Sequence, residues 1–240
     1  MAEPAGKRMG APPMAAGAAQ PPQVLLLHGI WNGRAWLGPL AWRLRRDGFR
    51  VATFGYSTAF GGAEAAVPRL QRRIEQLAAQ GPVALVGHSL GGLIALHALR
   101  QAPHLAVPRV VCLGSPLAGS AVAQSLQRRG LGPALGRSAA LLQQGIGRWD
   151  GAAAVGMVAG SVAVGIGNRF AALGPESDGT VALAETRVPG LHGHCLVRAS
   201  HSGLLFSPLA ARQAAAFLRH GRFAGTEASA PRMGRGGAIE

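Results

Sequence analysis

Acidic residues are scarce in this 240-residue chain: Asp and Glu number 10 against 24 Lys and Arg, which gives a formal net charge of +14. Lysine is scarcer still, because Lys7 is the only one, and the arginines are scattered from Arg8 to Arg235. A nucleic-acid footprint gathers its basic side chains on one face. The scatter therefore favours a compositional bias toward Ala, Gly and Arg over a nucleic-acid partner, and it equally disfavours a basic membrane-surface protein.

Cysteines and long apolar runs are also lacking. The two cysteines, Cys112 and Cys195, both lie in apolar, strand-like runs, and a disulfide framework needs more of them, so we predict free buried thiols. The longest weakly apolar stretch, residues 152–167, is too short for a membrane span. Residues 1–22 lack the continuous apolar core of a signal peptide. We expect a soluble, cytoplasmic protein, and no His/Cys/Asp spacing suggests a zinc site.

The chain reads as one domain between two tails. Residues 1–22 and 224–240 are rich in small residues and predict flexible tails around a domain at 23–223. Within it, short β-branched or leucine runs alternate with amphipathic segments, which predicts an α/β fold: a mostly parallel sheet with helices on both faces. The expected strands are 23–28, 50–56, 83–87, 109–114, 155–159 and 195–199, and the expected helices are 35–46, 63–79, 90–101 and 209–220.

Two segments leave alternatives open. Pro68 lies early in the second expected helix, which suggests that this helix begins there. Residues 117–151 are long and contain no clear strand, so we expect an excursion from the sheet. Its apolar side chains predict either a flap over a pocket or a helix packed on the sheet edge.

The segment 83–92 carries the central motif. Four apolar residues lead into a G-x-S-x-G pattern at Gly87, Ser89 and Gly91, and apolar residues at helical spacing follow. This context is typical of a nucleophile elbow, a sharp strand-to-helix turn that exposes the serine hydroxyl. An ordinary turn with a surface serine is the bland alternative, whereas a phosphate-binding loop would need a lysine that is absent here. We predict that Ser89 is a nucleophile.

Acyl transfer also needs N–H donors that stabilise the developing oxyanion. In such a fold one donor belongs to the residue after the nucleophile, here Leu90, and another to the loop after an early strand. The strand at 24–28 ends in His28-Gly29, which makes the backbone N–H of Ile30 our candidate, with Trp31 second. We expect His28 to pack the turn and to transfer no proton.

The acid should follow Ser89 in the chain and precede the catalytic histidine. Asp150 lies before the expected strand 155–159, whereas catalytic groups gather at the carboxyl ends of parallel strands. Asp178 follows that strand in a turn-rich loop, so we predict that it is the acid, with Glu176 in reserve. The alternative is an ordinary Asp-Gly turn.

The base is predicted by position, because a lone histidine is more often structural. His201 directly follows the expected strand 195–199, at its carboxyl end. His192 and His194 lie at the other end of that strand, and His220 ends the last helix. We therefore predict that His201 is the general base.

Together these segments resemble the α/β-hydrolase superfamily, and in particular its small bacterial lipase and esterase branch. The resemblance is carried by His28-Gly29-Ile30, by residues 87–92, by Asp178-Gly179 and by residues 201–205. The interval of 201 − 178 = 23 residues between acid and base is similar to that of the small lipases. Residues 117–151 are longer than the matching connection in the smallest members.

The resemblance implies hydrolysis of a small-molecule carboxylic ester, with an apolar acyl chain, through an acyl-enzyme. It implies neither a cofactor nor a metal. An acyltransferase that uses the same Ser-His-Asp triad is the alternative, because fold does not determine the acceptor. A catalytically silent binding module is the other class, and the intact set of three residues argues against it.

Overall fold

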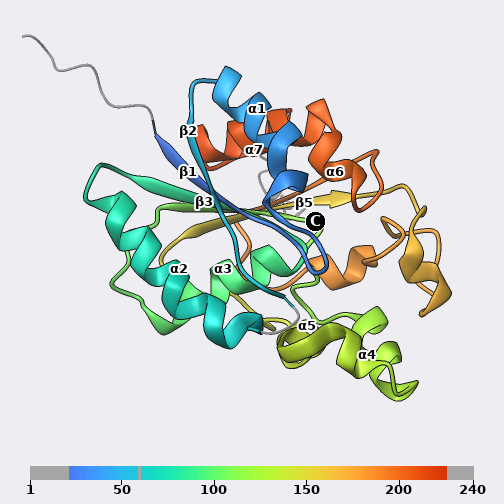
Figure 1. Ribbon diagram of the computed structural model, residues 1–240. Helices are drawn as coiled ribbons and strands as arrows, with labels where there is room; N and C mark the ends of the chain where they lie inside the picture. Colours follow the sequence, from blue (N-terminus) through green and yellow to red (C-terminus); the bar gives the residue numbers. More distant parts are fainter. Residues whose placement is uncertain (1–21, 59–60, 226–240) are drawn as a thin grey trace, which may run out of the picture.

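A computed structural model describes residues 22–58 and 61–225 (Figure 1). Residues 1–21 and 226–240, which make up most of the two predicted tails, lie outside the described residues. Six strands form one parallel sheet in the order β2-β1-β3-β4-β5-β6. The strands are β1 Gln23–Leu27, β2 Arg50–Phe54, β3 Val83–His88, β4 Arg109–Leu113, β5 Ala154–Gly160 and β6 Gly193–Val197.

Helices cover both faces of this sheet (Figure 1). On one face α1 and α7 enclose a core with Leu40, Phe217 and the strand side chains between them. On the other face α2 and α3 pack over a second core. The helices are η1 Arg34–Leu37, α1 Gly38–Arg46, α2 Gly62–Ala78, α3 Leu90–Gln101, α4 Ala121–Arg128, η2 Gly132–Ser138, α5 Ala139–Gln144, η3 Ile166–Arg169, η4 Leu183–Thr186, α6 Gly203–Phe206 and α7 Pro208–His220.

The predicted fold class is confirmed, because both faces of the sheet are buried. The strands β1 and β3 are buried at every residue, which is why their sequences are apolar runs without alternation. Each predicted strand overlaps an observed one, with ends displaced by one or two residues. Parallel pairing brings the carboxyl ends of all six strands to one edge of the sheet.

The expected helix at 63–79 is confirmed within one residue at each end, and the alternative start at Pro68 is wrong. Helix α2 begins at Gly62 and Pro68 lies inside it. Proline removes one backbone donor and leaves the carbonyl of residue i−4, here Glu64, without its helical partner. Both residues are exposed, so water can satisfy that carbonyl. The buried face of Val67, Leu70 and Ile74 packs on the sheet and stabilises the helix through the proline.

The two cysteines are free thiols. Cys112 is on β4 and Cys195 is on β6, and β5 runs between these strands. This order places two strand spacings of about 4.8 Å each between the two strands that carry the cysteines, which is beyond the reach of a disulfide. Burial raises the pKa of both thiols to about 12.

The excursion at 117–151 is helical and joins the main core. Its segments α4, η2 and α5 pack on one another, with η2 against α2 and α5 against α3. Leu135, Leu142, Ile146 and Trp149 are buried, whereas Leu131 is exposed. The segment thus lies on two helices of one face rather than on an edge strand, which corrects the sheet-edge alternative. Whether it opens as a flap remains a prediction.

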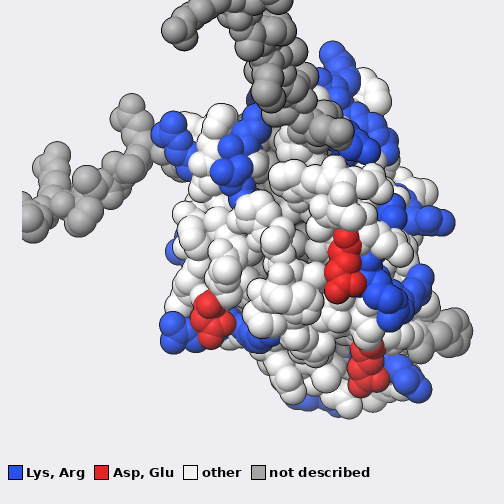
Figure 2. Space-filling view, turned by 90° about the vertical axis from the view of Figure 1, so that its left-hand side faces the viewer, with Lys and Arg blue, Asp and Glu red and all other residues white. Residues whose placement is uncertain are grey.

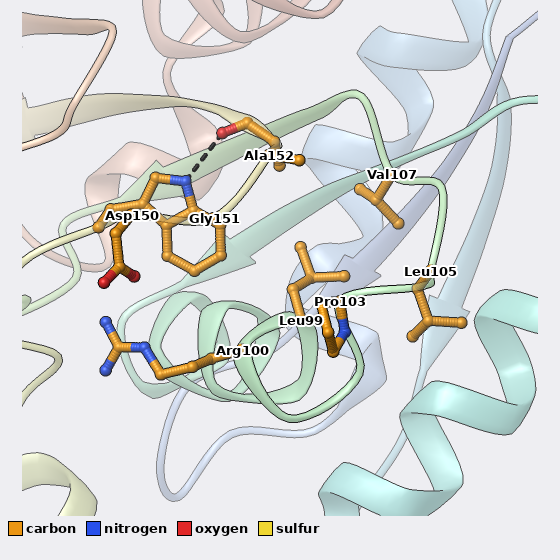
Figure 3. Close-up of a pocket in the computed structure, with 10 residues that line it drawn as sticks. Leu99, Arg100, Pro103, Leu105, Val107, Asp150, Gly151 and Ala152 are labelled. Carbon is orange, nitrogen blue, oxygen red and sulfur yellow. Dashed lines mark hydrogen bonds between the residues drawn. The ribbon is translucent and has the colours of Figure 1, made fainter.

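The opposite edge of the sheet, at the amino ends of the strands, carries two cavities. One of about 200 Å³ lies between the end of α3 and the loop before β5, where the Trp149 ring N–H donates to Ala153 O at 2.8 Å (Figure 3). Another of about 750 Å³ is lined by Pro82, Pro108 and residues near them. In Figure 2, arginine side chains stand at the rim of this side around a largely uncharged centre. Neither cavity includes Ser89, His201 or Asp178.

Within the described part of the chain, no helix is both long and apolar enough to cross a membrane.

Candidate active site

Ser89 occupies a strained turn between β3 and α3. Its backbone has φ 53° and ψ −123°, a left-handed conformation that non-glycine residues rarely adopt. Its N–H donates to Leu113 O, at the end of β4, at 2.9 Å. The residue is 6% exposed. Such strain persists where the surrounding structure enforces it, and it clusters at functional sites.

Glycines on either side of Ser89 make this turn possible. A β-carbon on Gly87 would lie 2.3 Å from the backbone nitrogen of Gly92, and one on Gly91 would lie 2.6 Å from Leu27 O. Both distances are far below van der Waals contact. The two glycines of the G-x-S-x-G pattern therefore allow the backbone of α3 to approach β3 and β1, which lifts Ser89 out of the line of the strand.

Asp178 and His201 form a buried, hydrogen-bonded pair. Nδ1 of His201 lies 2.7 Å from Oδ2 of Asp178, and the His201 backbone N–H donates to Asp178 O at 2.9 Å. The other carboxylate oxygen of Asp178 accepts the N–H groups of Thr180 at 2.9 Å and Val181 at 2.7 Å. Asp178 is 1% and His201 9% exposed. Since the carboxylate accepts, Nδ1 carries the hydrogen, and Nε2 is left as the basic nitrogen of a neutral ring.

The pair lies over the carboxyl end of β4, where Ser89 is also anchored. A β-carbon on Gly114, the residue after β4, would lie 3.0 Å from Oδ2 of Asp178 and 3.2 Å from Nδ1 of His201. Gly114 follows Leu113, whose carbonyl holds Ser89. The end of β4 is thus shared by the three residues that the sequence singled out.

His88 joins Ser89 and His201, although the sequence analysis gave it no role. Its ring lies 4.7 Å from the ring of His201, and its Nε2–H donates to His201 O at 3.0 Å. Its Nδ1 is buried without a partner among the described residues. Burial, followed by the neighbouring charge of His201, lowers the pKa of His88 to about 3. His88 is therefore neutral at physiological pH.

The turn after β1 lies against the nucleophile. A β-carbon on Gly29 would lie 3.0 Å from Cβ of Ser89. The N–H of Ile30 forms no hydrogen bond with any described residue, whereas the N–H of Trp31 donates to Thr58 Oγ1 at 3.3 Å. Leu90 is the first residue of α3, a position whose N–H has no partner inside the helix. Ile30 and Leu90 therefore keep donors available beside Ser89, and Trp31 does not.

Four contacts hold this turn in place. His28 is buried, and its Nδ1–H donates to Gly29 O at 2.9 Å. The ring of His28 stacks on Tyr56 at 4.3 Å, and the Tyr56 hydroxyl donates to His28 O. The Trp31 ring N–H donates to Ala134 O at 2.8 Å, which ties the turn to the excursion. Burial lowers the pKa of His28, which keeps its ring neutral.

The other sequence candidates lie apart from this arrangement. Glu176 is exposed, and Asp150 lies at the amino edge of the sheet. His192 is exposed before β6, and His194 Nε2 contacts Thr186 Oγ1 at 2.8 Å. Burial lowers the pKa of His194 to about 4. The described His, Cys, Asp and Glu residues form no cluster of three that could hold a metal ion.

Glu185 is a second residue that sequence reasoning missed. Its carboxylate accepts the N–H of Ala121, at the start of α4, at 2.6 Å and the N–H of Ala182 at 2.9 Å. Its own carbonyl accepts the N–H of Ala118 at 2.9 Å. Burial raises its pKa, and the two N–H donors oppose that effect. Glu185 thus joins the excursion to the segment that follows Asp178.

Comparison with known proteins identifies the fold. Residues 22–135 match the family model of the alpha/beta hydrolase fold. No curated protein matches the chain in sequence. The mature lipase BlEst2 of Bacillus licheniformis is similar in structure, with a TM-score of 0.62 and 21% identity over 88% of this chain and 95% of that chain.

Two further solved structures have the same fold. The metagenomic carboxyl esterase MGS0156 gives a TM-score of 0.55 at 18% identity, over 84% of this chain and 70% of that chain. Phospholipase PlaB of Legionella pneumophila, in complex with thio-NAD, gives 0.54 at 18% identity, over 69% of this chain and 44% of that chain. The sheet, the strained serine turn and these matches define an α/β-hydrolase fold. Residues 22–135 match the alpha/beta hydrolase family, and the solved structures extend the likeness in fold over most of the chain.

Proposed function

We propose that this protein is a serine hydrolase that cleaves carboxylic esters through an acyl-enzyme intermediate. Ser89 is the nucleophile, His201 the general base and Asp178 the acid that orients it. The observation that carries the proposal is the 2.7 Å contact between Nδ1 of His201 and Oδ2 of Asp178. It fixes the tautomer in which Nε2 accepts a proton, and it lies at the same strand end as Ser89.

The reaction has two steps, acylation of Ser89 and hydrolysis of the acyl-enzyme. His201 Nε2 takes the Ser89 hydroxyl proton as Oγ attacks the ester carbonyl, which forms a tetrahedral oxyanion. The C–O bond to the alcohol breaks, and His201 gives its proton to the leaving alkoxide, so the acyl group stays on Ser89. A water molecule then attacks the acyl-enzyme, with His201 again as base. Collapse of the second intermediate returns the proton to Ser89 and releases the carboxylic acid.

The oxyanion is stabilised by the backbone N–H groups of Ile30 and Leu90. Both donors are available beside Ser89. Because they belong to the backbone, their positions do not depend on a side-chain rotamer. Donors fixed before the reaction stabilise the developing charge without a reorganisation cost, and the loss of one such donor lowers kcat by about 100-fold or more.

The substrate side of the proposal is a small-molecule ester with an apolar acyl chain. Trp36 and Phe206 are both exposed, and their rings meet edge to face at 6.2 Å. Trp36 follows the turn that carries Ile30, and Phe206 ends the short helix after His201. This aromatic pair forms an exposed apolar surface on the two segments that follow Ile30 and His201 in the chain, which supports an acyl chain of that character.

The proposal is tested by covalent labelling with a fluorophosphonate, together with a panel of p-nitrophenyl esters of increasing acyl length. We expect one label on the peptide that contains Ser89, and turnover of at least one ester. Ser89→Ala should abolish labelling and lower turnover by about four or more orders of magnitude. Near-wild-type turnover in a folded Ser89→Ala variant refutes the proposal, and labelling without turnover of any ester favours an acyltransferase.

A further inference from the structure

An open cavity of about 410 Å³ lies beside the turn that carries Ile30. It is lined by His28, Gly33, Arg34, Gly55, Tyr56, Ser57 and Arg69. The residues come from the carboxyl ends of β1 and β2 and from the facing side of α2. In open parallel sheets, ligands bind at this edge.

The fold holds two arginines over the end of β2. A β-carbon on Gly55 would lie 2.9 Å from Cδ and 3.0 Å from Nε of Arg34, so Arg34 lies across that glycine. The guanidinium carbon of Arg69 lies 5.9 Å from the ring centre of Phe54, the last residue of β2. Both residues are exposed, and these contacts hold their side chains against the end of β2.

The charge of these arginines is not compensated within the described part of the protein. Neither Arg34 nor Arg69 forms an ion pair or a hydrogen bond with another described residue. Glu64, the acid in the first turn of α2, lies 3.8 Å from Arg137 instead. Below them, burial lowers the pKa of His28, and the charge of Arg34 adds a smaller contribution in the same direction. The cavity therefore presents two guanidinium groups and no carboxylate.

We propose that Arg34 and Arg69 bind an oxyanionic group, a phosphate or a carboxylate, on the alcohol half of the ester substrate. Guanidinium groups bind both oxyanions through paired, charge-assisted hydrogen bonds. The aromatic pair of Trp36 and Phe206 takes the acyl half, which leaves this cavity for the other half. This inference rests on the proposed esterase function.

The distance between the cavity and the nucleophile fits such a substrate. Ser89 follows β3, and Gly55 follows β2, with β1 between these strands. Two strand spacings correspond to about 10 Å. An alcohol whose anionic group lies a few bonds from the ester oxygen covers part of this separation. The long side chain of an arginine covers the rest.

The first experiment measures anion binding without catalysis. Inorganic phosphate is titrated into the full-length protein by calorimetry at low ionic strength. We expect saturable binding by the wild type that weakens about tenfold or more in an Arg34→Gln/Arg69→Gln double variant. Arg72→Gln is the matched control, since Arg72 is an exposed arginine one turn further along α2 and outside the cavity. If Arg72→Gln weakens phosphate binding as much as the double variant does, or if the double variant does not weaken it, the proposed anion site is refuted.

The second experiment assigns the anion to the substrate. Hydrolysis of glycerol 3-phosphate butyrate is compared with that of the neutral glycerol butyrate, with release of butyrate as the readout. We expect kcat/KM for the phosphorylated ester, divided by kcat/KM for the neutral ester, to fall about tenfold in the double variant. The same ratio should stay unchanged in Arg72→Gln. If phosphate binding depends on both arginines but this ratio does not, the anion is a free ion and the substrate assignment is overturned.

The two experiments separate this inference from the proposed function. If no ester is hydrolysed while phosphate binding still depends on Arg34 and Arg69, the esterase proposal fails and the substrate assignment fails with it, but the anion site stands. If esters are hydrolysed with no dependence on these arginines, only the inference fails. Thermal melting of each variant verifies that it is folded.

Discussion

The Nε2–H group of His88 donates to the backbone oxygen of His201 at 3.0 Å, across 113 residues of chain. The same histidine directly precedes Ser89. One side chain therefore links the turn of the proposed nucleophile to the loop of the proposed base. We interpret His88 as a positioning residue, because it contacts the backbone of the base rather than a reacting atom.

Replacement of His88 tests that role. His88→Leu removes the donor, so we expect kcat/KM for a p-nitrophenyl ester to fall on the order of tenfold, since small misplacements of a catalytic group are costly. His88→Gln can still donate to His201 O and should retain more activity. Fluorophosphonate labelling rates should follow the same order. Equal activity in wild type and His88→Leu would show that this bond does not matter for the geometry.

The burial of His88 also predicts a loss of stability in acid. Its pKa is lowered from 6.5 to about 3 in the folded protein, so above about pH 6.5 it is neutral in both the folded and the unfolded state and contributes nothing to the pH dependence. As the pH falls below this value, the unfolded state takes up a proton and the folded state does not. The free energy of unfolding then decreases by up to about 1.4 kcal/mol per pH unit until the pH approaches the folded pKa.

His88→Gln removes this titration. Urea unfolding between pH 7 and pH 4 should therefore show a shallower decline for His88→Gln than for the wild type, by about 1.4 kcal/mol per pH unit at the acidic end. His220→Gln is the control, because His220 is exposed at the end of α7. Parallel curves for wild type and His88→Gln would contradict a buried, neutral His88.

The acid and the base are tested by their own substitutions. His201→Ala should be nearly as damaging as Ser89→Ala, because the two residues act as one unit. Asp178→Asn should also be severe, since it removes the acceptor for Nδ1–H and with it the tautomer that exposes Nε2. Steady-state kinetics on one p-nitrophenyl ester measure both effects.

Three residues serve as controls for that assignment. Glu176→Gln, His192→Ala and His194→Ala should keep most of the activity, because none of these side chains contacts Asp178 or His201 through a hydrogen bond. If His194→Ala abolishes activity and His201→Ala does not, the base is wrongly assigned. If Glu176→Gln is severe and Asp178→Asn silent, only the acid changes.

The glycines beside Ser89 give a prediction about stability. A β-carbon on Gly91 would lie 2.6 Å from Leu27 O and 2.7 Å from His28 O, both backbone atoms of neighbouring elements. Gly91→Ala should therefore lower the free energy of unfolding by about 3 kcal/mol, as overpacking does in a rigid interior. Gly38→Ala is the matched control, because a β-carbon there meets nothing within 4 Å. Urea unfolding of both variants is the measurement, and equal stabilities would contradict the close approach.

The sequence predicted the sheet because its central strands, such as β1 and β3, are covered on both faces and so form continuous apolar runs. Chain order and strand ends sufficed to single out Asp178 and His201, which the structure brings together. The links from His88 to His201 and from Trp31 to Thr58 could not be predicted in the same way. They join side chains to backbone atoms far away in the chain, and such contacts leave no periodic pattern. Pro68 shows the reverse case, in which packing overrides a local preference.

Glu185 gives the last prediction, which concerns the excursion at 117–151. Its carboxylate accepts two backbone N–H groups, from Ala121 and Ala182. Glu185→Ala would leave both donors without a partner in a partly buried position, so we expect the free energy of unfolding to fall by about 2 to 4 kcal/mol. Glu185→Gln retains one acceptor oxygen and should lose less. Glu75→Ala removes an exposed acid paired with His104 at 3.6 Å and should change stability by about 0.5 kcal/mol or less.

The same variant distinguishes a packed excursion from one that moves as a flap. If the excursion only packs, Glu185→Ala should lower stability while kcat/KM changes little at temperatures where the protein is folded. If it opens over the site, loosening its anchor at α4 should change KM more than kcat, because access to Ser89 changes and the reacting groups do not. Hydrogen exchange of residues 121–144 in wild type and Glu185→Ala supplies the independent readout. Unchanged exchange together with unchanged stability would show that Glu185 does not hold the excursion at all.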